Sequence, residues 1–448
     1  MGMKKTARSL FVLAFLVLSS ALNTPGQDAR TSGPVFEVQD YRLRNGLRVI
    51  LSEDGSLPLV TVVVAFGAGT IREEPGQEGL AYLLENLMFQ GSENVSPLQH
   101  VGFIQKVGGE LNATTTLDKS LFYETFPSNY LALALWLESD RMKSLAITAA
   151  AIEKTRADIL KEHQARLVSD PYLASFARFD ALLFPDFPYG HPLIGSGAEM
   201  RGFTEGDVLA FHQKFYVPNN AVLCIVGDID LAKTRDLVAR YFDSIPPGYD
   251  APMPPPPVFR QDGEVAQSLS GIQAASAGFH LGYRFYPLQT GDASALRILE
   301  YLLFKGETSR LRNRLLRRDL TAHYLSGALE DRRGVLALKV FCLNNNAVMA
   351  QRSQKAIASE FEKLRANPVS ADELAKAKHQ FKMDYLRRLS TRLGRAFFLI
   401  DTAFSGRPLD AMGAELEGCL RVSSTALTSL VGRHIVPRNK VVLELEQR

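Results

Sequence analysis

The 448-residue sequence contains few cysteines and no closely spaced pair of them. Cys224, Cys342 and Cys419 are odd in number and far apart, and no C-x-x-C motif occurs. The sequence therefore predicts neither a disulfide framework nor a thiolate metal site. It also lacks the G-x-S-x-G and P-loop motifs, so it gives no support to a self-sufficient enzyme with serine-hydrolase or nucleotide chemistry.

A strong overall charge is also missing. The formal net charge is only +3, with 22% charged and 46% hydrophobic residues. Nothing in this balance requires nucleic acid or an anionic membrane as a partner. The basic run between Arg310 and Arg318 is typical of a solvated helix face. The composition is that of an ordinary globular protein, and the length suggests two or three domains.

Long apolar runs are absent beyond the N-terminus. Lys4, Lys5 and Arg8 precede an apolar stretch over residues 10–18, and small residues follow it at 19–21. A membrane span needs roughly 20 apolar residues, and this run is shorter. We therefore expect residues 1–21 to be a removed signal peptide and the mature chain to have no membrane anchor. Such a chain is exported, to the periplasm if the source is a Gram-negative bacterium and otherwise to the medium.

A short internal repeat lies on both sides of a proline-rich stretch. Residues 84–91 (LENLMFQG) resemble residues 299–306 (LEYLLFKG) at an offset of 215 residues. A strand-like segment precedes each copy, at residues 60–66 and 278–285. Because each octet closes a helical pattern and ends in glycine, we expect a helix to end there in both halves.

The repeat and the prolines together predict the organisation of the chain. Proline stiffens the backbone and removes donors, so residues 246–262 are expected to be a linker. They separate an N-terminal domain, residues 36–245, from a related C-terminal domain, residues 263–448. The fold class is α+β, with two homologous mixed α/β-sheet domains. Further expected elements are a strand at 221–226 and helices at 131–142, 149–167, 231–242 and 371–393.

The segment YLLEN at residues 82–86 is the most informative for chemistry. A zinc site on a helix needs two imidazoles at i and i+4, and in the arrangement H-x-x-E-H an acid precedes the second histidine. Glu85 occupies the position of the acid, but Tyr82 and Asn86 occupy the ligand positions, and both are poor zinc donors. None of the eight histidines forms an i, i+4 pair. By itself, such a pentad is typical of an amphipathic core helix.

The surrounding segments resemble the pitrilysin/insulinase family of zinc metallopeptidases over nearly all of the mature length. The resemblance rests on the helix containing YLLEN and on three further segments, GGELNATTTLD at 108–118, FYVPNN at 215–220 and GDID at 227–230. It implies that the chain is half of a four-domain clamshell.

The resemblance also implies roles for residues in the N-terminal half. Tyr82 and Asn86 replace the two zinc histidines, Glu85 is the remnant of the general base, and Glu162, 76 residues after Asn86, takes the place of the third ligand. We therefore expect no catalytic zinc in this chain. Asn112 and Ala113 are implied to lie on an edge strand that pairs with extended peptide.

In the C-terminal half, the resemblance implies a pair of residues that reach substrate bound at zinc. Arg317 and Tyr324 have the seven-residue spacing of that pair. A guanidinium and a phenol aimed at the developing oxyanion stabilise it. Without the resemblance, a surface arginine and a buried tyrosine would be the simpler interpretation.

Three functions remain open on this basis. The favoured one is a non-catalytic, substrate-binding and oxyanion-stabilising subunit of a heteromeric zinc metalloendopeptidase that acts on unfolded peptides outside the cytoplasm. Its partner would be a paralogous chain that carries the zinc. The second is a non-enzymatic scaffold or peptide-binding protein of the same family, which would have no need of Arg317 and Tyr324. The third is an enzyme with different chemistry.

Overall fold

The structure is a computed structural model that describes residues 36–185, 188–250, 252–254, 261–271, 276–332, 335–409 and 412–446. The predicted signal peptide, residues 1–21, lies outside the described residues. The described parts of the predicted linker form no helix or strand.

The first half is built on a six-stranded mixed sheet. Its order is β1-β2-β6-β3-β5-β4, in which only β2 and β6 are parallel. The central strands β3 and β6 are almost continuously apolar and buried, as expected for strands covered on both faces. The strands are β1 (Val38–Arg42), β2 (Arg48–Glu53), β3 (Leu59–Phe66), β4 (Glu110–Thr115), β5 (Ser120–Pro127) and β6 (Ala221–Gly227).

In the part of the chain that the structure describes, the second half repeats this sheet without a counterpart of β1. Its order, β7-β11-β8-β10-β9, follows β2-β6-β3-β5-β4 strand by strand, and again only the first pair is parallel. The strands are β7 (Val265–Leu269), β8 (Ala277–Phe285), β9 (Tyr324–Arg332), β10 (Val335–Asn344) and β11 (Lys440–Leu445). The predicted fold class, two homologous mixed α/β-sheet domains, is confirmed.

The helices follow the same repeat. Helix α1 (Leu80–Leu87), which follows β3, corresponds to α9 (Asp292–Leu303), which follows β8. Leu84 and Leu299 of the predicted repeat are both buried on these helices. The helices end at Leu87 and Leu303, a few residues before Gly91 and Gly306, so the glycines belong to the turns that follow, where both have positive φ. The other helices of the first half are α2 (Gln99–Lys106), α3 (Leu131–Lys143), α4 (Ala149–Ser169), α5 (Leu173–Leu183), α6 (Gly197–Gly202), α7 (Glu205–Phe215) and α8 (Leu231–Phe242). Those of the second half are α10 (Arg310–Arg312), α11 (Ala347–Ala366), α12 (Ala371–Ser390), α13 (Arg392–Phe404), α14 (Met412–Leu420) and α15 (Ser424–His434), with a π-helical turn η4 (Asn313–Arg318) after α10.

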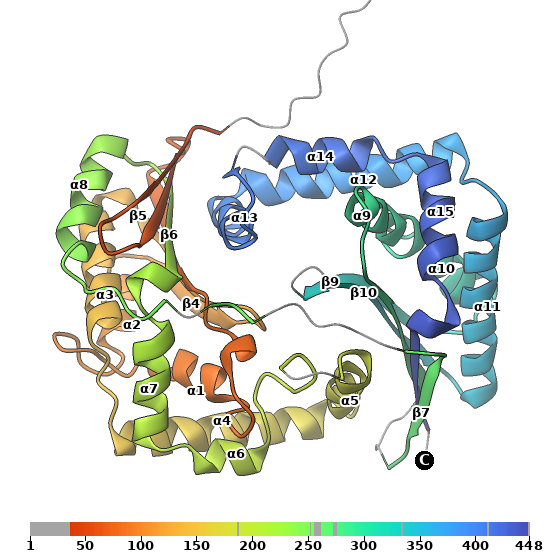
Figure 1. The fold of residues 1–448 in the computed structure, drawn as a ribbon, viewed down its shortest axis with the longest axis horizontal. Coiled ribbons are helices and arrows are strands. Elements are labelled where there is room, and N and C mark those ends of the chain that lie inside the picture. The colour runs from red at the N-terminus through yellow and green to blue at the C-terminus, as the bar shows by residue number, and fades with distance from the viewer. Residues whose placement is uncertain are drawn as a thin grey trace, which may run out of the picture.

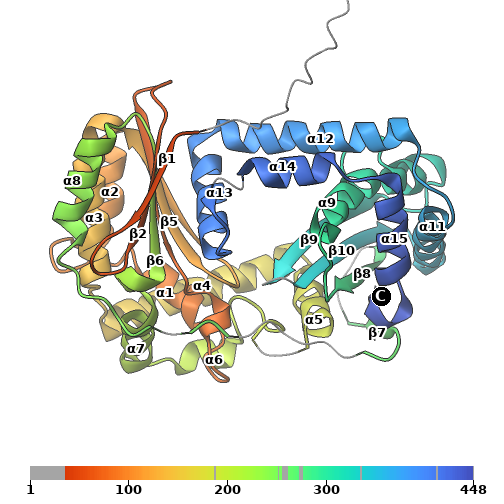
Figure 2. The same ribbon diagram turned by 45° about the horizontal axis from the view of Figure 1, so that its top comes forward.

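The two halves exchange one helix each. Helix α5 of the first half packs on β8 and β11 of the second sheet, and α13 of the second half packs on β3 and β6 of the first (Figures 1 and 2). His280 of β8 is accordingly buried between Phe179 of α5 and Phe341 of β10, and it contacts Ser175 Oγ at 2.7 Å. Each half therefore completes the core of the other.

One predicted helix is wrong in its extent. Residues 371–393 form no single helix, because α12 ends at Ser390 and α13 begins at Arg392. Thr391 separates them, and its hydroxyl accepts a hydrogen bond from the Gly394 amide at 3.1 Å, which caps α13. None of the described helices combines the length and apolarity that crossing a bilayer requires.

Candidate functional site

Helix α1 is held at its N-terminus by a buried carboxylate. Glu73 accepts hydrogen bonds from the amides of Gly79 at 3.1 Å and Ala81 at 2.8 Å. Amides of the first turn have no partner within their own helix, so this carboxylate satisfies two of them. Burial raises the pKa of Glu73 to about 8, although the two amides act to lower it. Sequence reasoning missed Glu73; the signal was an acidic residue shortly before the helix.

The face of α1 that points away from the core carries Tyr82 and Asn86. Both are half-buried, whereas the apolar residues of the helix are buried. Asn86 Nδ2 donates to the Tyr82 carbonyl at 2.9 Å, so the amide that replaces a ligand is engaged by its own helix. Burial raises the pKa of Tyr82, and the charges of Glu85 and Glu162 raise it further. The phenol is therefore neutral near pH 7.

Glu85 faces β4, beside these two residues. Burial raises its pKa, and hydrogen bonds with the side chain and backbone of Thr115 act to lower it. Among the described residues, Glu85 Oε2 has no hydrogen-bond partner. A carboxyl group of this kind can hold or release a proton.

Glu162 comes from α4, which packs against α1. Its electrostatic effect on Tyr82 shows that the fold brings the predicted third ligand position to the same place. Its side chain is nevertheless 58% exposed and forms an ion pair with Arg166 one turn later, at 2.6 Å. Glu162 is thus bound to a neighbouring guanidinium.

The donor set does not fit a hydrolytic zinc ion. Such a site uses imidazole nitrogens, thiolates or free carboxylates, with an open position for water. Here the fold assembles a neutral phenol at Tyr82, an amide at Asn86 whose neutral oxygen is a poor zinc donor, and a carboxylate at Glu162 that is paired with Arg166. No catalytic step through a metal at this position follows from these residues.

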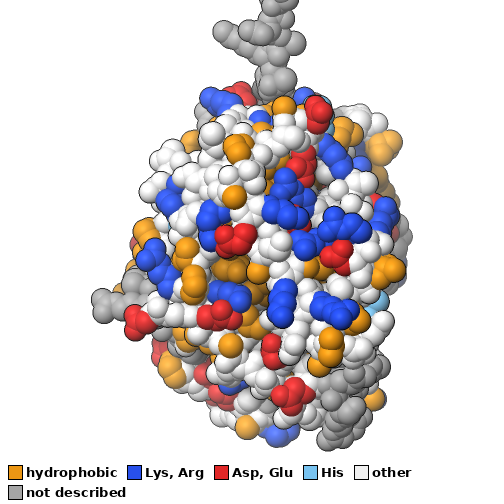
Figure 3. Space-filling model, turned by 90° about the vertical axis from the view of Figure 1, so that its right-hand side faces the viewer, with side chains coloured by type: hydrophobic (Ala, Val, Ile, Leu, Met, Phe, Trp, Pro, Cys, Tyr) orange, Lys and Arg blue, Asp and Glu red, His pale blue; other side chains and the backbone are white. Residues whose placement is uncertain are grey.

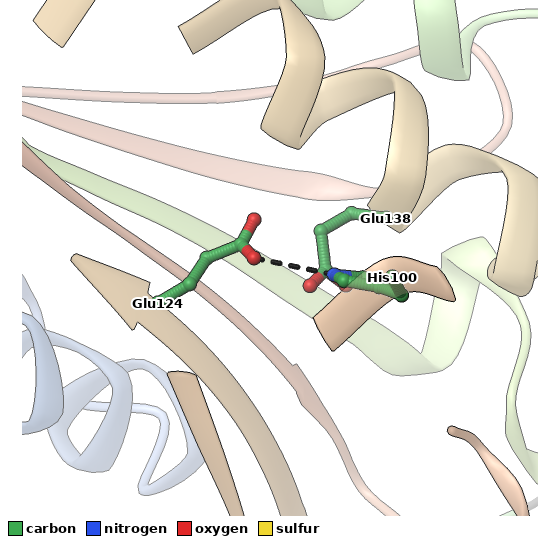
Figure 4. Close-up of side chains that lie close together, drawn as sticks. All are labelled: His100, Glu124 and Glu138. Atoms are coloured by element: carbon green, nitrogen blue, oxygen red, sulfur yellow. Dashed lines mark hydrogen bonds and ion pairs between the residues drawn. The ribbon is translucent and has the colours of Figure 1, made fainter. Parts of the chain in front are cut away.

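A second polar cluster lies inside the first half. His100 of α2, Glu124 of β5 and Glu138 of α3 are all buried and have possible ligand atoms within 4.8 Å of one another, a grouping found once among the described residues (Figure 4). His100 Nε2 lies 3.2 Å from Glu124 Oε2. The Arg141 guanidinium donates to both carboxylate oxygens of Glu138, with Nε at 2.9 Å. Because the Arg141 guanidinium already binds the Glu138 carboxylate, we interpret the cluster as a buried polar network and not as a metal site.

The protonation of this network is set by burial. Burial raises the pKa of Glu124 to about 8, with Arg141 acting in the opposite direction. Burial lowers the pKa of His100 to about 4, and Arg141 lowers it further. The pair is thus most stable when it shares a single proton. Sequence reasoning missed the cluster, although Glu138 and Arg141 stand at i, i+3 in an otherwise apolar helix.

Asn112 and Ala113 lie on β4, the last strand of the first sheet. They are opposite Tyr123 and Phe122 of β5, which leaves the other edge of β4 without a neighbouring strand in the described sheet. Asn112 is exposed, and its Oδ1 accepts the Ala113 amide at 2.8 Å. A peptide pairing with this edge would have to displace that side chain.

Arg317 and Tyr324 lie in the second half, near the start of its edge strand. Arg317 is the next-to-last residue of η4; its side chain is 52% exposed and forms an ion pair with Glu307 at 2.6 Å. Tyr324 begins β9, is 48% exposed, and packs on Phe341 with ring centroids 5.8 Å apart. Leu320 makes the turn between them with a positive φ of 49°. Both predicted polar groups are therefore accessible.

The backbone just before β9 already forms a regular hydrogen bond with β10. The amide of His323 donates to the Leu343 carbonyl at 3.0 Å. The fold thus brings Tyr82, Glu85, Asn86 and Glu162 together in one half and presents Arg317 and Tyr324 on the other.

Two family descriptions match successive parts of the chain. Residues 48–194 match "Insulinase (Peptidase family M16)", and residues 202–381 match "Peptidase M16 inactive domain". The zinc protease PqqE of Helicobacter pylori is 26% identical over 385 residues, covering 85% of this chain and 86% of that protein.

Solved structures show the same architecture. A protease from Helicobacter pylori superposes with a TM-score of 0.86 at 23% identity, covering 92% of this chain and all of the other. The periplasmic protease PqqL from Escherichia coli superposes with a TM-score of 0.76 at 17% identity, and the match covers 93% of this chain but 48% of PqqL. The fold of this chain thus corresponds to half of that larger protein.

Proposed function

Because the chain belongs to the insulinase family of peptidases, peptidase family M16, we propose that it is the non-catalytic subunit of a heteromeric zinc metalloendopeptidase. In this proposal, the chain carries no catalytic zinc, and the metal is held by a paralogous partner with an intact H-x-x-E-H motif. The complex acts on unfolded peptides. The chain is exported, and PqqL, a periplasmic protease by its description, has the same fold.

The observation that carries the proposal is the contrast between the two halves. We call the place where Tyr82 and Asn86 of α1 lie near Glu162 of α4 the α1–α4 face. It has a neutral phenol, an amide and a paired carboxylate where zinc ligands would be needed. Tyr324 is 48% exposed, and the exposed Arg317 guanidinium is paired with Glu307, so a bound molecule would reach Tyr324 directly and Arg317 by displacing Glu307. A chain that has lost its metal donors and kept oxyanion donors can serve a metal site in another subunit.

Substrate would bind in extended form along β4. An edge strand offers backbone amides and carbonyls to an incoming peptide, and residues 112–113 lie on such an edge. The hydrogen bond from the Ala113 amide to Asn112 Oδ1 protects this edge when no peptide is present.

The test is reconstitution with a zinc-bearing partner. Tyr324→Phe removes only a hydroxyl, so the complex should assemble while turnover falls by about a hundredfold to a thousandfold, the usual cost of losing one oxyanion donor. Tyr130, an exposed tyrosine of the first half, gives the matched control, and Tyr130→Phe should leave turnover unchanged.

Arg317 is tested in the same complex. Arg317→Ala should reduce turnover, whereas Arg318→Ala removes a neighbouring, comparably exposed guanidinium and should not. If Tyr324→Phe and Arg317→Ala both assemble and turn over normally, the complementation mechanism is wrong. The non-enzymatic scaffold or peptide-binding protein then becomes the better interpretation.

A further inference from the structure

The turn between η4 and β9 has an unusual backbone conformation. Leu320 lies in it with a φ of 49°, in the left-handed region that residues other than glycine seldom adopt. Its side chain is 67% exposed, so burial of the leucine does not compensate for this conformation. Such a conformation persists only where the surrounding structure fixes it. The turn separates Arg317 from Tyr324, the two residues of the second half to which the proposed function assigns a role.

A buried polar network contacts the next residue of the turn, Thr321. Asn344, the last residue of β10, donates from Nδ2 to the Thr321 carbonyl at 2.7 Å and to Ser353 Oγ at 2.8 Å. Ser353 of α11 in turn donates its hydroxyl hydrogen to Thr321 Oγ1 at 2.8 Å. Each of the three residues is therefore hydrogen-bonded to the other two, and they come from three different segments of the chain.

The network is shielded from water. Asn344 and Ser353 are fully buried, and Thr321 is 7% exposed. Charged side chains of both signs cover the outer side of the second half, where α11 lies (Figures 1 and 3), whereas Ser353 faces inward from α11. Hydrogen bonds are stronger in a protein interior of low dielectric constant than in water, and a buried network of paired groups holds its members in one arrangement. The turn is therefore fixed from inside the fold.

Backbone hydrogen bonds join the same turn to the elements on either side of it. The Thr321 amide donates to the Leu315 carbonyl of η4 at 3.0 Å, and the Ala322 amide donates to the same carbonyl at 3.3 Å. The His323 amide donates to the Leu343 carbonyl of β10. Thr321 is thus anchored through its amide, its carbonyl and its hydroxyl, three residues before β9 begins.

The corresponding turn of the first half, between α2 and β4, is closed differently. Gly108 provides its positive φ, 77°. Gly109 packs so closely on Ile104 and Phe126 that an added Cβ atom would lie 2.8 Å from a carbon of each side chain. Phe126 corresponds to Asn344, because each comes directly after the residue that pairs with the first residue of the edge strand. An apolar contact therefore closes this turn in one half, and a polar network closes it in the half that carries the predicted oxyanion donors.

We propose that Thr321, Asn344 and Ser353 are positioning residues for the Tyr324 hydroxyl. This role rests on the proposed function, in which Tyr324 donates to an oxyanion at the zinc ion of a partner. A donor acts only when it is aimed at the place where the charge develops, and a misplacement of about 1 Å can cost roughly a hundredfold in rate. Because the Tyr324 side chain is half-exposed, the position of its hydroxyl depends on the backbone from which it projects. The network fixes that backbone.

Hydrogen exchange of the free mature chain tests whether the network holds the turn. Thr321→Val replaces the hydroxyl with a methyl group and keeps the backbone carbonyl in place. The amides of residues 321–323 should then exchange at least roughly tenfold faster than in the wild type, while those of residues 335–340 in β10 keep their rates. Thr402→Val is the matched control, because it removes a buried hydroxyl that donates to the Phe398 carbonyl within α13. Unchanged exchange of residues 321–323 in Thr321→Val overturns the proposal.

Turnover in the complex with a zinc-bearing partner tests whether holding the turn positions the Tyr324 hydroxyl. Thr321→Val should lower kcat by about tenfold to a hundredfold with KM nearly unchanged. Thr321→Ser keeps the hydroxyl and should retain most of the activity. In the Tyr324→Phe background, Thr321→Val should lower kcat by less than about threefold, because no hydroxyl is left to misplace. Thr402→Val should leave kcat as in the wild type.

The positioning role and the proposed function fail in different ways. If Tyr324→Phe alone leaves turnover unchanged, the proposed function is wrong and the positioning role is wrong with it. If Tyr324→Phe lowers turnover but Thr321→Val does not, the proposed function stands and the positioning role is overturned. An equally large effect of Thr321→Val with and without the Tyr324 hydroxyl overturns the positioning role as well, because the loss would then act through some other group.

Discussion

Tyr82 and Asn86 are one helical turn apart on α1, so imidazole can be restored at both positions without changing the fold. The mature wild-type chain should contain far less than one zinc per molecule by elemental analysis. The variant Tyr82→His, Asn86→His should bind zinc, since two imidazoles at i, i+4 then face Glu85 and Glu162. Adding Arg166→Ala should tighten binding further, because it releases the Glu162 carboxylate.

Two outcomes would contradict this account of the α1–α4 face. One is stoichiometric zinc in the wild-type chain that is lost on Glu162→Ala. The other is zinc bound by the histidine variant with equal affinity whether or not Glu162 is present. The His100–Glu124–Glu138 cluster is a separate place in the core, so His100→Ala serves as the control for metal bound elsewhere.

The shared proton of His100 and Glu124 predicts a bell-shaped dependence of stability on pH. The pKa of Glu124 is raised to about 8 in the folded chain. The contribution of Glu124 to the free energy of unfolding is therefore lost as pH rises above the pKa that Glu124 has in the unfolded chain. The pKa of His100 is lowered to about 4 in the folded chain. The contribution of His100 to the free energy of unfolding is therefore lost as pH falls below about 6.5, the pKa of histidine in the unfolded chain. Between about 4.5 and 6.5 the folded and unfolded chains hold the same number of protons at this pair, so its contribution is greatest there.

The alkaline side of this curve gives the measurement. Between about pH 6.5 and 8 the pair should reduce the free energy of unfolding by about 1.4 kcal/mol per pH unit. Glu124→Gln cannot ionise and should make the slope shallower by this amount in urea unfolding series, while Glu73, whose pKa is also raised to about 8, keeps its own contribution. Glu110→Gln, an exposed change on β4, should leave it as in the wild type. An unchanged slope in Glu124→Gln would show that the pair does not hold a proton at neutral pH.

At the scale of elements, α1 depends on Glu73 for its N-terminus. Glu73→Ala leaves the amides of Gly79 and Ala81 without their acceptor in a buried place and should cost about 1–3 kcal/mol in the free energy of unfolding. The neighbour Glu74 is exposed, and Glu74→Ala should change stability by less than about 0.5 kcal/mol. Equal costs for the two changes in denaturant unfolding would mean that Glu73 does not cap the helix.

The exchanged helices predict how the whole molecule unfolds. Because α5 covers the second sheet and α13 covers the first, neither half has a complete core alone. We therefore expect a single cooperative unfolding transition by calorimetry. Two resolved transitions, in which one half remains folded, would contradict this expectation.

Asp180 of the first half forms ion pairs with Arg332 and Lys339 of the second half, and so contributes to this joint unfolding. Asp180→Ala leaves the almost fully buried Arg332 side chain with one carboxylate partner fewer. The cost should be about 2 kcal/mol, below the roughly 3–5 kcal/mol of a fully buried pair, because Asp180 is 24% exposed. Asp158→Ala, at an exposed position of α4, is the control and should have little effect.

Several features were determined by the sequence alone. The apolar runs of β3, β6 and β8 predicted strands nearly to the residue, because alternation and turn signals are local properties. The octet repeat around Leu84 and Leu299 predicted two homologous halves, and its copies lie on corresponding helices. The absence of histidine from the segment at residues 82–86 is likewise read directly from the sequence.

The tertiary structure alone decided which surfaces meet. Periodicity shows that α5 and α13 have buried faces, but it cannot show that each is buried on the sheet of the other half. The family resemblance implied that Glu162 lies near α1, but the ion pair with Arg166 depends on side-chain positions on an exposed helix. His100, Glu124 and Glu138 lie on three different elements, so only the packing of these elements reveals that they meet in one core. Contacts between residues far apart in the chain depend on the balance of burial and charge over the whole fold, which no local pattern contains.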